Sequence, residues 1–190
     1  MHRFFKTLAI TAAAVGAFTP TLALAGSYDR IVAQDSTIAF TYSQMGVSLQ
    51  GSFARFDGTL AFDAERPEQA SARIEVALES ISTGLAEADV EAAKPTWFNI
   101  EAFPSARFES TAVRALGENR YEVTGELSIK GHTKEVVFPA SFSAADGIGR
   151  FEGDLSIRRG DFSIGEGSWS RFNILANEVT VRFSIAATSD

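Results

Sequence analysis

The chain has 190 residues, of which 45% are apolar and 22% charged, and its formal net charge is −7. This length suits one domain of about 150 residues with a short appendage, and the composition is that of a globular protein rather than a disordered, collagenous or helical membrane protein. The chain has no cysteine, which excludes disulfide frameworks, cysteine nucleophiles and iron–sulfur clusters. Its sixteen phenylalanines are a heavy aromatic load for this length.

Residues 1–25 have the pattern of a secretory signal peptide. A basic start precedes an alanine-rich apolar stretch at 8–18, and Ala23-Leu24-Ala25 is a small-x-small cleavage sequence. The apolar stretch is shorter than the ~20 residues that a membrane span requires. We therefore expect cleavage near Ala25, secretion, and a single folded domain at 26–190.

Removal of this leader makes the remaining chain more acidic. The leader carries two of the 17 basic residues and none of the 24 acidic ones, so the expected charge of the secreted chain is 15 minus 24, or −9. An acidic body disfavours nucleic acid and anionic membrane surfaces as partners. The one basic doublet, Arg158-Arg159, is expected to be a solvated strand end. We predict no nucleic-acid partner and no stable membrane insertion.

Apolar and polar residues alternate with the period of strands that bury one face. Tight-turn residues such as Gly131 and Asp146-Gly147 separate several of the runs. This pattern predicts an all-β protein of about eight antiparallel strands in an up-and-down meander, which can close into a barrel. The alternating runs lie at 38–42, 47–53, 56–62, 74–78, 121–129, 136–142, 151–157 and 179–185, with a less regular candidate at 106–113.

Two intervals break the alternation. Leu85 to Lys94 is rich in alanine and glutamate and predicts a short helix, which Pro95 ends. The following Trp97-Phe98-Asn99-Ile100 is too apolar for an ordinary exposed loop, so it either plugs one end of the domain or covers a ligand cavity. The second interval, 161–177, is aromatic and glycine-rich and is expected at the same mouth.

The composition does not decide whether such a barrel is filled or open. An eight-stranded barrel is filled by its own side chains or holds one small ligand. Burying a phenylalanine contributes roughly 1.5–3 kcal/mol, so stability alone explains the aromatic load. Small residues within the strands would open space, although strand glycines more often mark bulges or curvature. These small residues are Gly51, Ala54, Gly125, Ala140 and Gly153.

Four segments, which span almost all of the expected mature chain in order, resemble the YceI family. They are Ser43 to Phe53 (SQMGVSLQGSF), Trp97 to Pro104, Leu127 to Thr133 and Arg159 to Trp169. The resemblance implies a lipocalin-like eight-stranded barrel in the bacterial periplasm whose elongated apolar interior binds a polyisoprenoid. The chain looks closest to the branch whose domains are sometimes fused to, or encoded beside, a di-haem b-type membrane cytochrome, which implies a quinone-related context and makes such a cytochrome a candidate partner.

Three positions depart from the family pattern. Typical members carry histidines where this chain has Asp35 and Gln44, and an Arg-Asp pair where it has Ala88-Asp89. Any role of these polar residues in holding a charged head group is weakened here. An isoprenoid tail gains about 0.8 kcal/mol per buried methylene without polar partners, whereas a diphosphate needs Lys, Arg or a helix N-terminus. We therefore expect a neutral ligand, ubiquinone-like or prenyl, and no cofactor.

No catalytic or metal-binding motif appears in the sequence. His132 is the one histidine of the expected mature chain, and Lys130-Gly131-His132-Thr133 predicts an exposed hairpin turn. With one histidine and no cysteine, a transition metal would depend on carboxylates, and no calcium loop is present. Glu166, between two glycines, is a weak candidate for a carboxylate at a cavity mouth. We predict no enzymatic activity and no bound metal.

The sequence therefore predicts a secreted periplasmic protein that binds and carries an isoprenoid lipid or quinone without catalysis. Two alternatives stay open: a filled module that docks on a membrane b-type cytochrome, and an outer-membrane barrel, whose apolar face would point to lipid. The predicted ligand-binding side chains on the inward parity are Phe40, Tyr42, Leu49, Phe53, Ile74, Val76, Phe108, Val123, Phe138, Phe151 and Phe183. Those predicted at the mouth are Trp97, Phe98, Phe162 and Trp169.

Overall fold

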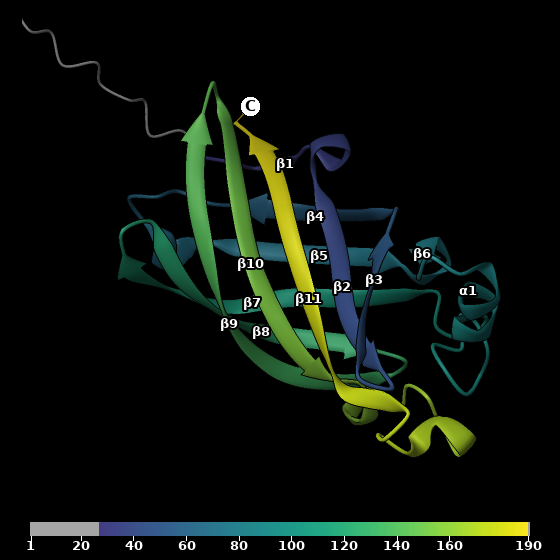
Figure 1. Ribbon diagram of the computed structural model, residues 1–190. Helices are drawn as coiled ribbons and strands as arrows, with labels where there is room; N and C mark the ends of the chain where they lie inside the picture. The colour runs from purple at the N-terminus through teal and green to yellow at the C-terminus, as the bar shows by residue number, and fades with distance from the viewer. Residues whose placement is uncertain (1–26, 190) are drawn as a thin grey trace, which may run out of the picture.

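In the computed structural model of the protein, residues 27–189 form one strongly curled antiparallel sheet with a single short α-helix (Figure 1). The structure describes residues 27–189, so the predicted signal peptide lies outside the described residues. The helix α1 spans Ala86–Ala92. The strands are β1 (Arg30–Ile31), β2 (Thr37–Gln44), β3 (Val47–Phe53), β4 (Phe56–Ala61), β5 (Ser71–Ala77), β6 (Ile81–Ser82), β7 (Ser105–Gly117), β8 (Arg120–Ile129), β9 (His132–Ala145), β10 (Ile148–Arg158) and β11 (Leu175–Thr188). Short 3-10 segments are η1 (Ala33–Asp35), η2 (Pro67–Gln69), η3 (Leu78–Ser80), η4 (Arg159–Phe162) and η5 (Gly167–Ser170).

The strands follow one another as a meander. Their hydrogen-bonded order is β4-β5-β7-β8-β9-β10-β11-β2-β3-β6, and β1 pairs with β11. Tight turns produce this order, and at Met45-Gly46, Lys130-Gly131 and Asp146-Gly147 both central residues have positive φ. Two-residue hairpins whose twist matches that of the strands need this conformation. The predicted antiparallel meander and short helix are confirmed.

The structure has eleven strands among residues 27–189 rather than about eight. β1 and β6 have two residues each, too few to give an alternating pattern in the sequence. The less regular candidate at 106–113 is the core of the full strand β7. These differences change the strand count and leave the predicted architecture intact.

Closure of the barrel is incomplete. β4 and β6 end the strand order and do not pair with each other within the described part of the chain. Short pairing of Phe53 with Ile81 joins β3 to β6 at one end, and a bridge between Tyr28 and Phe62 joins the N-terminal segment to the end of β4 at the other. The expectation of a fully closed cylinder is thus corrected to a curled sheet that is bridged at both ends.

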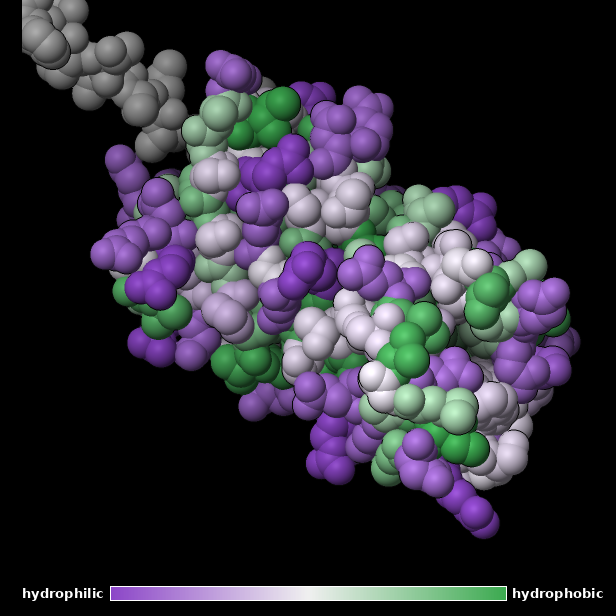
Figure 2. Space-filling model, in the orientation of Figure 1, coloured by the Kyte–Doolittle hydropathy of each residue, from purple (hydrophilic) through white to green (hydrophobic). Residues whose placement is uncertain are grey.

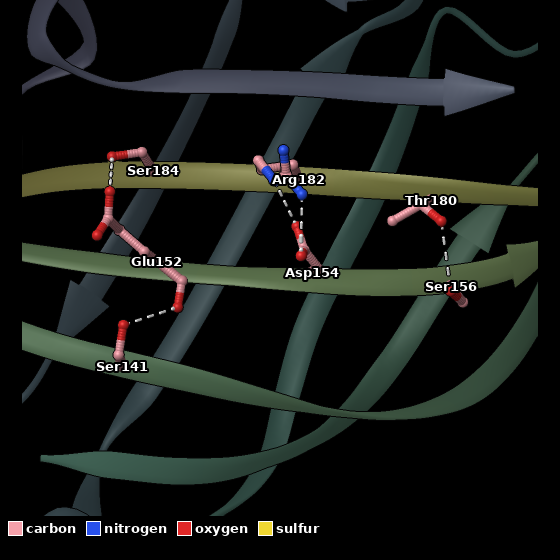
Figure 3. Close-up of polar contacts among 7 residues, drawn as sticks. All are labelled: Ser141, Glu152, Asp154, Ser156, Thr180, Arg182 and Ser184. Atoms are coloured by element: carbon pink, nitrogen blue, oxygen red, sulfur yellow. Dashed lines mark hydrogen bonds and ion pairs between the residues drawn. The ribbon is translucent and has the colours of Figure 1, made fainter. Parts of the chain in front are cut away.

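The outer face of β10 and β11 is polar. Arg182 Nε donates to Asp154 Oδ1 at 2.8 Å, and Ser184 and Glu152 form a second contact along the same strands (Figure 3). Neighbouring residues of opposite parity, such as Phe183 and Leu155, line the interior. The structure therefore places the apolar parity inside, a choice that alternation alone left open.

Candidate functional site: an apolar cavity with one open end

The curled sheet encloses a cavity of about 620 Å³, within the range of ligand pockets in proteins. Apolar side chains from β2 to β5 and from β7 to β11 supply most of the lining. Phe40, Phe108 and Phe183 remain only partly buried because they face this space. Among residues 27–189, the large side chains with less than 2% exposure are Phe162 and Leu78. The interior is therefore open rather than filled.

Strand glycines explain why the interior rings leave space. Phe40 lies directly opposite Gly51 across β2 and β3, and a Cβ on that glycine would come within 2.3 Å of Phe40 Cζ. A Cβ on Gly125 would come within 2.5 Å of Phe108 Cε2. Each ring thus occupies the position of a missing side chain and lies close to the wall. Because the glycines let these rings lie against the strands, the centre of the cavity stays open.

An aromatic cluster closes the end of the cavity remote from α1. Phe62, Tyr121 and Phe142 are buried there, with Tyr28 and Phe151 packed against them. The centroid of the Phe62 ring lies 4.7 Å from that of Phe142 and 4.9 Å from that of Phe151. The Trp97 segment, predicted either to plug one end of the domain or to cover a cavity, is not part of this cluster and packs against the main core. Phe62 and Tyr121 lie in alternating runs of the sequence but were not among the residues predicted to face inward.

The opposite end, beside α1, is the mouth of the cavity. The mouth is lined by Gln44, Thr83, Leu85, Glu87, Trp97 and Trp169. Leu85 is 59% exposed, so the apolar lining meets solvent here. The Trp97 and Trp169 ring centroids lie 5.5 Å apart, and Trp97 Nε1 donates to Glu91 Oε1 at 3.3 Å. The two irregular intervals of the sequence therefore meet at one mouth, as predicted.

Arg159 organises the segment that carries Trp169. Its exposure is 2%, which corrects the expectation of a solvated doublet. Its guanidinium donates bonds of 2.7–3.3 Å to the main-chain oxygens of Ile164, Gly165, Trp169, Leu175 and Ala176. All five N–H groups are engaged in this way. Burial lowers the pKa of Arg159, and the group has no N–H left for a ligand.

The same segment is fastened to two neighbours. Lys130 Nζ donates to the main-chain oxygen of Ser163 at 2.7 Å and to Glu166 Oε2 at 2.6 Å. The N–H groups of Gly165 and Glu166 both donate to the oxygen of Thr96, beside Trp97. Glu166 therefore faces Lys130 and does not line the cavity.

Gln44, Thr83, Glu87 and Glu91 give the mouth neutral and acidic polar side chains. Asp89 Oδ1 accepts bonds of 2.7 Å from the main-chain N–H and the hydroxyl of Thr83. Burial, and to a lesser extent the charge of Asp89, raise the pKa of Tyr42. The cations that line the cavity are Arg159 and Arg107, and Arg107 is paired with Glu75. The lining offers acceptors but no unengaged cation for a phosphate.

Positions that depart from the family pattern fall in two places. Gln44 and Ala88 line the cavity at its mouth, while Asp35 lies in η1 and is outside the lining. Two of the three departures are therefore neutral residues in the cavity lining. Gln44, Thr83, Glu87 and Glu91 were missing from the predicted site because they lie outside the alternating apolar pattern.

Every predicted ligand-binding residue lines the cavity except Leu49 and Phe162. Leu49 pairs with Tyr42 near the β2–β3 turn and is only partly buried. Phe162 has 2% exposure and packs in the core with Leu78, so its predicted place at the mouth is wrong. It is the last residue of η4. Contact of the other predicted residues with a ligand stays a prediction.

Three further findings concern membrane-spanning helices, metal clusters and His132. Among residues 27–189, no helix combines the length and the apolar character that crossing a membrane would require. Within the same residues, histidine, aspartate and glutamate side chains form no cluster suited to a metal ion. His132 is exposed, as predicted, but it is the first residue of β9 and follows the turn residues Lys130 and Gly131 instead of lying within the turn.

The curled antiparallel sheet around an open apolar cavity defines a β-barrel domain of the ligand-binding class. A family model described as the YceI-like domain matches residues 30–187. The chain belongs to this family, so the resemblance inferred from its sequence is confirmed. The association with a b-type cytochrome stays a prediction.

Relatives and solved structures agree with this assignment. A UPF0312 protein of Azotobacter vinelandii is 35% identical over 138 residues, 69% of this chain and 72% of that protein. The crystal structure of Burkholderia cenocepacia BcnA is 32% identical, with a TM-score of 0.81, covering 83% of this chain and 99% of BcnA. A polyisoprenoid binding domain from Saccharophagus degradans shares the fold at 16% identity, with a TM-score of 0.68, covering 87% of this chain and 99% of that domain.

Proposed function

We propose that the protein binds the tail of an isoprenoid lipid in its cavity and sequesters or carries that lipid without changing it chemically. The observation that carries this proposal is the apolar cavity of about 620 Å³, whose lining reaches solvent at the exposed Leu85. Each buried methylene contributes about 0.8 kcal/mol, so several isoprene units give useful affinity without polar contacts. The shared fold of the polyisoprenoid binding domain from Saccharophagus degradans supports this ligand class.

The mouth favours a neutral head group, ubiquinone-like or a prenyl alcohol. Every N–H of Arg159 is donated to the protein's own carbonyl oxygens, and Glu87 and Glu91 line the entrance. A diphosphate would meet like charge there, and both arginines of the lining are already engaged within the protein. The acidic chain adds to this repulsion, since residues 26–190 hold 15 basic and 24 acidic residues.

The setting that we propose is the periplasm, after cleavage near Ala25. The signal-like pattern of residues 1–25 supports secretion, and a lipid that crosses an aqueous compartment needs a shielded tail. A membrane b-type cytochrome that uses quinone is a proposed partner. An open cavity favours a carrier over a filled docking module, and the outward-facing Asp154 and Arg182 disfavour an outer-membrane barrel.

Mass spectrometry of lipid extracted from protein purified from its native host tests the ligand class. The matched variants are Val123→Trp, which fills the cavity, and Val137→Trp on the outer face, where Val137 is 54% exposed. We expect a prenyl lipid in the wild type and in Val137→Trp, and little in Val123→Trp. Equal lipid in all three folded proteins would contradict binding in the cavity. A prenyl diphosphate that binds far more tightly than quinone would overturn the neutral head group.

A further inference from the structure

Exposed apolar side chains gather around the mouth of the cavity. Of the eight large apolar side chains that are exposed among residues 27–189, six lie on three segments at this end. We call these six the apolar rim: Met45, Val47, Leu85, Val90, Phe172 and Ile174. The remaining two, Leu116 and Val137, lie on β7 and β9. In Figure 2, green side chains lie over the lower right of the molecule, where Figure 1 places α1 and the segment before β11.

The rim is continuous with the lining of the cavity. Met45 is 76% exposed at the β2–β3 turn, and its main-chain N–H donates to the oxygen of Ile174 at 2.7 Å. This bond holds the two segments on one side of the mouth together. Leu85 belongs both to the rim and to the lining, and Gln44 lines the cavity next to Met45. A lipid tail that leaves the mouth therefore meets exposed apolar side chains.

The charges near the rim do not favour an anionic surface. Segments 43–48 and 170–175 contain one charged residue, Arg171. On the other side of the mouth, α1 carries Glu87, Asp89 and Glu91. One arginine facing three carboxylates offers little attraction to acidic lipids, so desolvation of apolar side chains is the main force for adhesion.

We propose that the apolar rim docks the protein on the surface of a zwitterionic lipid bilayer, with the mouth facing the hydrocarbon. This proposal rests on the proposed function, because a tail that passes from bilayer to cavity through such a contact is never exposed to water. A second copy of the chain is the less suitable occupant. Mouth-to-mouth contact would bring Glu87 and Glu91 of two copies together, and like charges oppose such an interface.

A flotation experiment with phosphatidylcholine vesicles tests the proposal. It uses the protein as it is isolated from its host. The rim variant is Met45→Asn with Val47→Ser, because asparagine tolerates the positive φ of residue 45. The control is Leu116→Ser with Val137→Ser, which removes two exposed apolar side chains elsewhere. We expect the vesicle partition coefficient to fall about tenfold or more in the rim variant, and to stay unchanged in the control. High salt or anionic lipid should not strengthen wild-type binding.

Binding of a short-tail ubiquinone without vesicles, measured by ultrafiltration, separates this proposal from the proposed function. The rim variant should bind it as the wild type does, yet take up ubiquinone from vesicles more slowly. Wild type that binds the quinone but never the vesicles would overturn docking and leave the carrier function standing. Failure of the wild type to bind any prenyl lipid would instead overturn the carrier function. Rim substitutions that dissociate a dimer, with no vesicle binding, would assign the rim to contact between copies.

Discussion

The ring of Phe183 occupies the space that a side chain at Gly153 would fill. The two residues lie directly opposite each other across β11 and β10. A Cβ on Gly153 would come within 2.7 Å of Phe183 Cζ and within 2.6 Å of the main-chain oxygen of Pro139. Glycine in the interior of a strand weakens the strand by itself. Here it lets a wide ring lie against the wall of a cavity that has to stay open.

Gly153→Ala should lower the free energy of unfolding by about 1–3 kcal/mol, because ring and strand must both shift. In a Phe183→Ala background the same change should cost less, since the ring is gone and the contact with Pro139 remains. Urea unfolding of the four proteins of this double-mutant cycle measures the coupling. Equal costs in both backgrounds would show that the ring does not depend on the glycine.

A carboxylate inside the cavity should prevent lipid retention. Phe53 lines the cavity, with its ring centroid 5.3 Å from that of Phe40 and 6.4 Å from that of Phe98. In Phe53→Asp, a bound tail would have to cover a charged group without partners, which is strongly unfavourable. Lipid that copurifies with the protein should disappear in this variant.

Val137→Asp is the control for that experiment, because Val137 lies on the outer face and is 54% exposed. It should retain lipid as the wild type does. Phe151→Asp should also lose lipid, but Phe151 stacks on Phe142 at 4.9 Å in the closed end, so its folding must be checked by circular dichroism. A folded Phe53→Asp protein that keeps its full lipid content would refute the assigned interior.

Period-2 alternation was enough to predict the strands and most of the lining, because the parity of a strand determines its face. Ile74, Val123 and Phe183 were found in this way. Alternation gives no information where residues act through distant main-chain partners. Arg159 reads as half of a basic doublet, and only the fold brings five carbonyl oxygens around it.

Other features depend on length or on contacts that a single sequence does not contain. β1 and β6 are too short to alternate, and the contact between Tyr28 and Phe62 is an isolated bridge, so the sequence did not show how the curled sheet is held at its two ends. Gly51 and Gly153 were noticed as small residues, but their effect works through phenylalanines on neighbouring strands. That pairing depends on the strand register, which alternation alone does not give.

Arg159 should be essential for the shape of the mouth. Arg159→Lys leaves an ammonium with three donors among five acceptors. Unmet buried acceptors cost about 1–3 kcal/mol each when no water reaches them, so we expect a loss of stability of about 3 kcal/mol or more. Because Trp169 sits on the segment that Arg159 holds, tryptophan emission should shift to the red.

Arg158→Lys is the matched control, since Arg158 is the exposed neighbour at the end of β10. It should leave both thermal unfolding and tryptophan emission unchanged. The chain has only two tryptophans, and both line the mouth, so the emission reports on this region. If the two variants were equally stable, the carbonyl cage would not hold the segment.

The ion pair of Asp154 and Arg182 on the outer face should give a small, pH-dependent contribution to stability (Figure 3). The hydrogen bond from Arg182, followed by its charge, lowers the pKa of Asp154 in the folded protein. A lowered folded pKa means that the stabilisation is complete above the unfolded pKa of about 3.9 and is lost as the pH falls through the folded value. Arg182→Ala should therefore lower the Tm at pH 7 and have no effect in strong acid. Because both groups are largely exposed, the decrease in Tm should be only about 1–2 °C.

The control is the Asp154→Asn background, in which the effect of Arg182→Ala on the Tm should no longer depend on pH. If Arg182→Ala lowers the Tm equally at pH 7 and in strong acid, the decrease comes from side-chain packing and not from the ion pair.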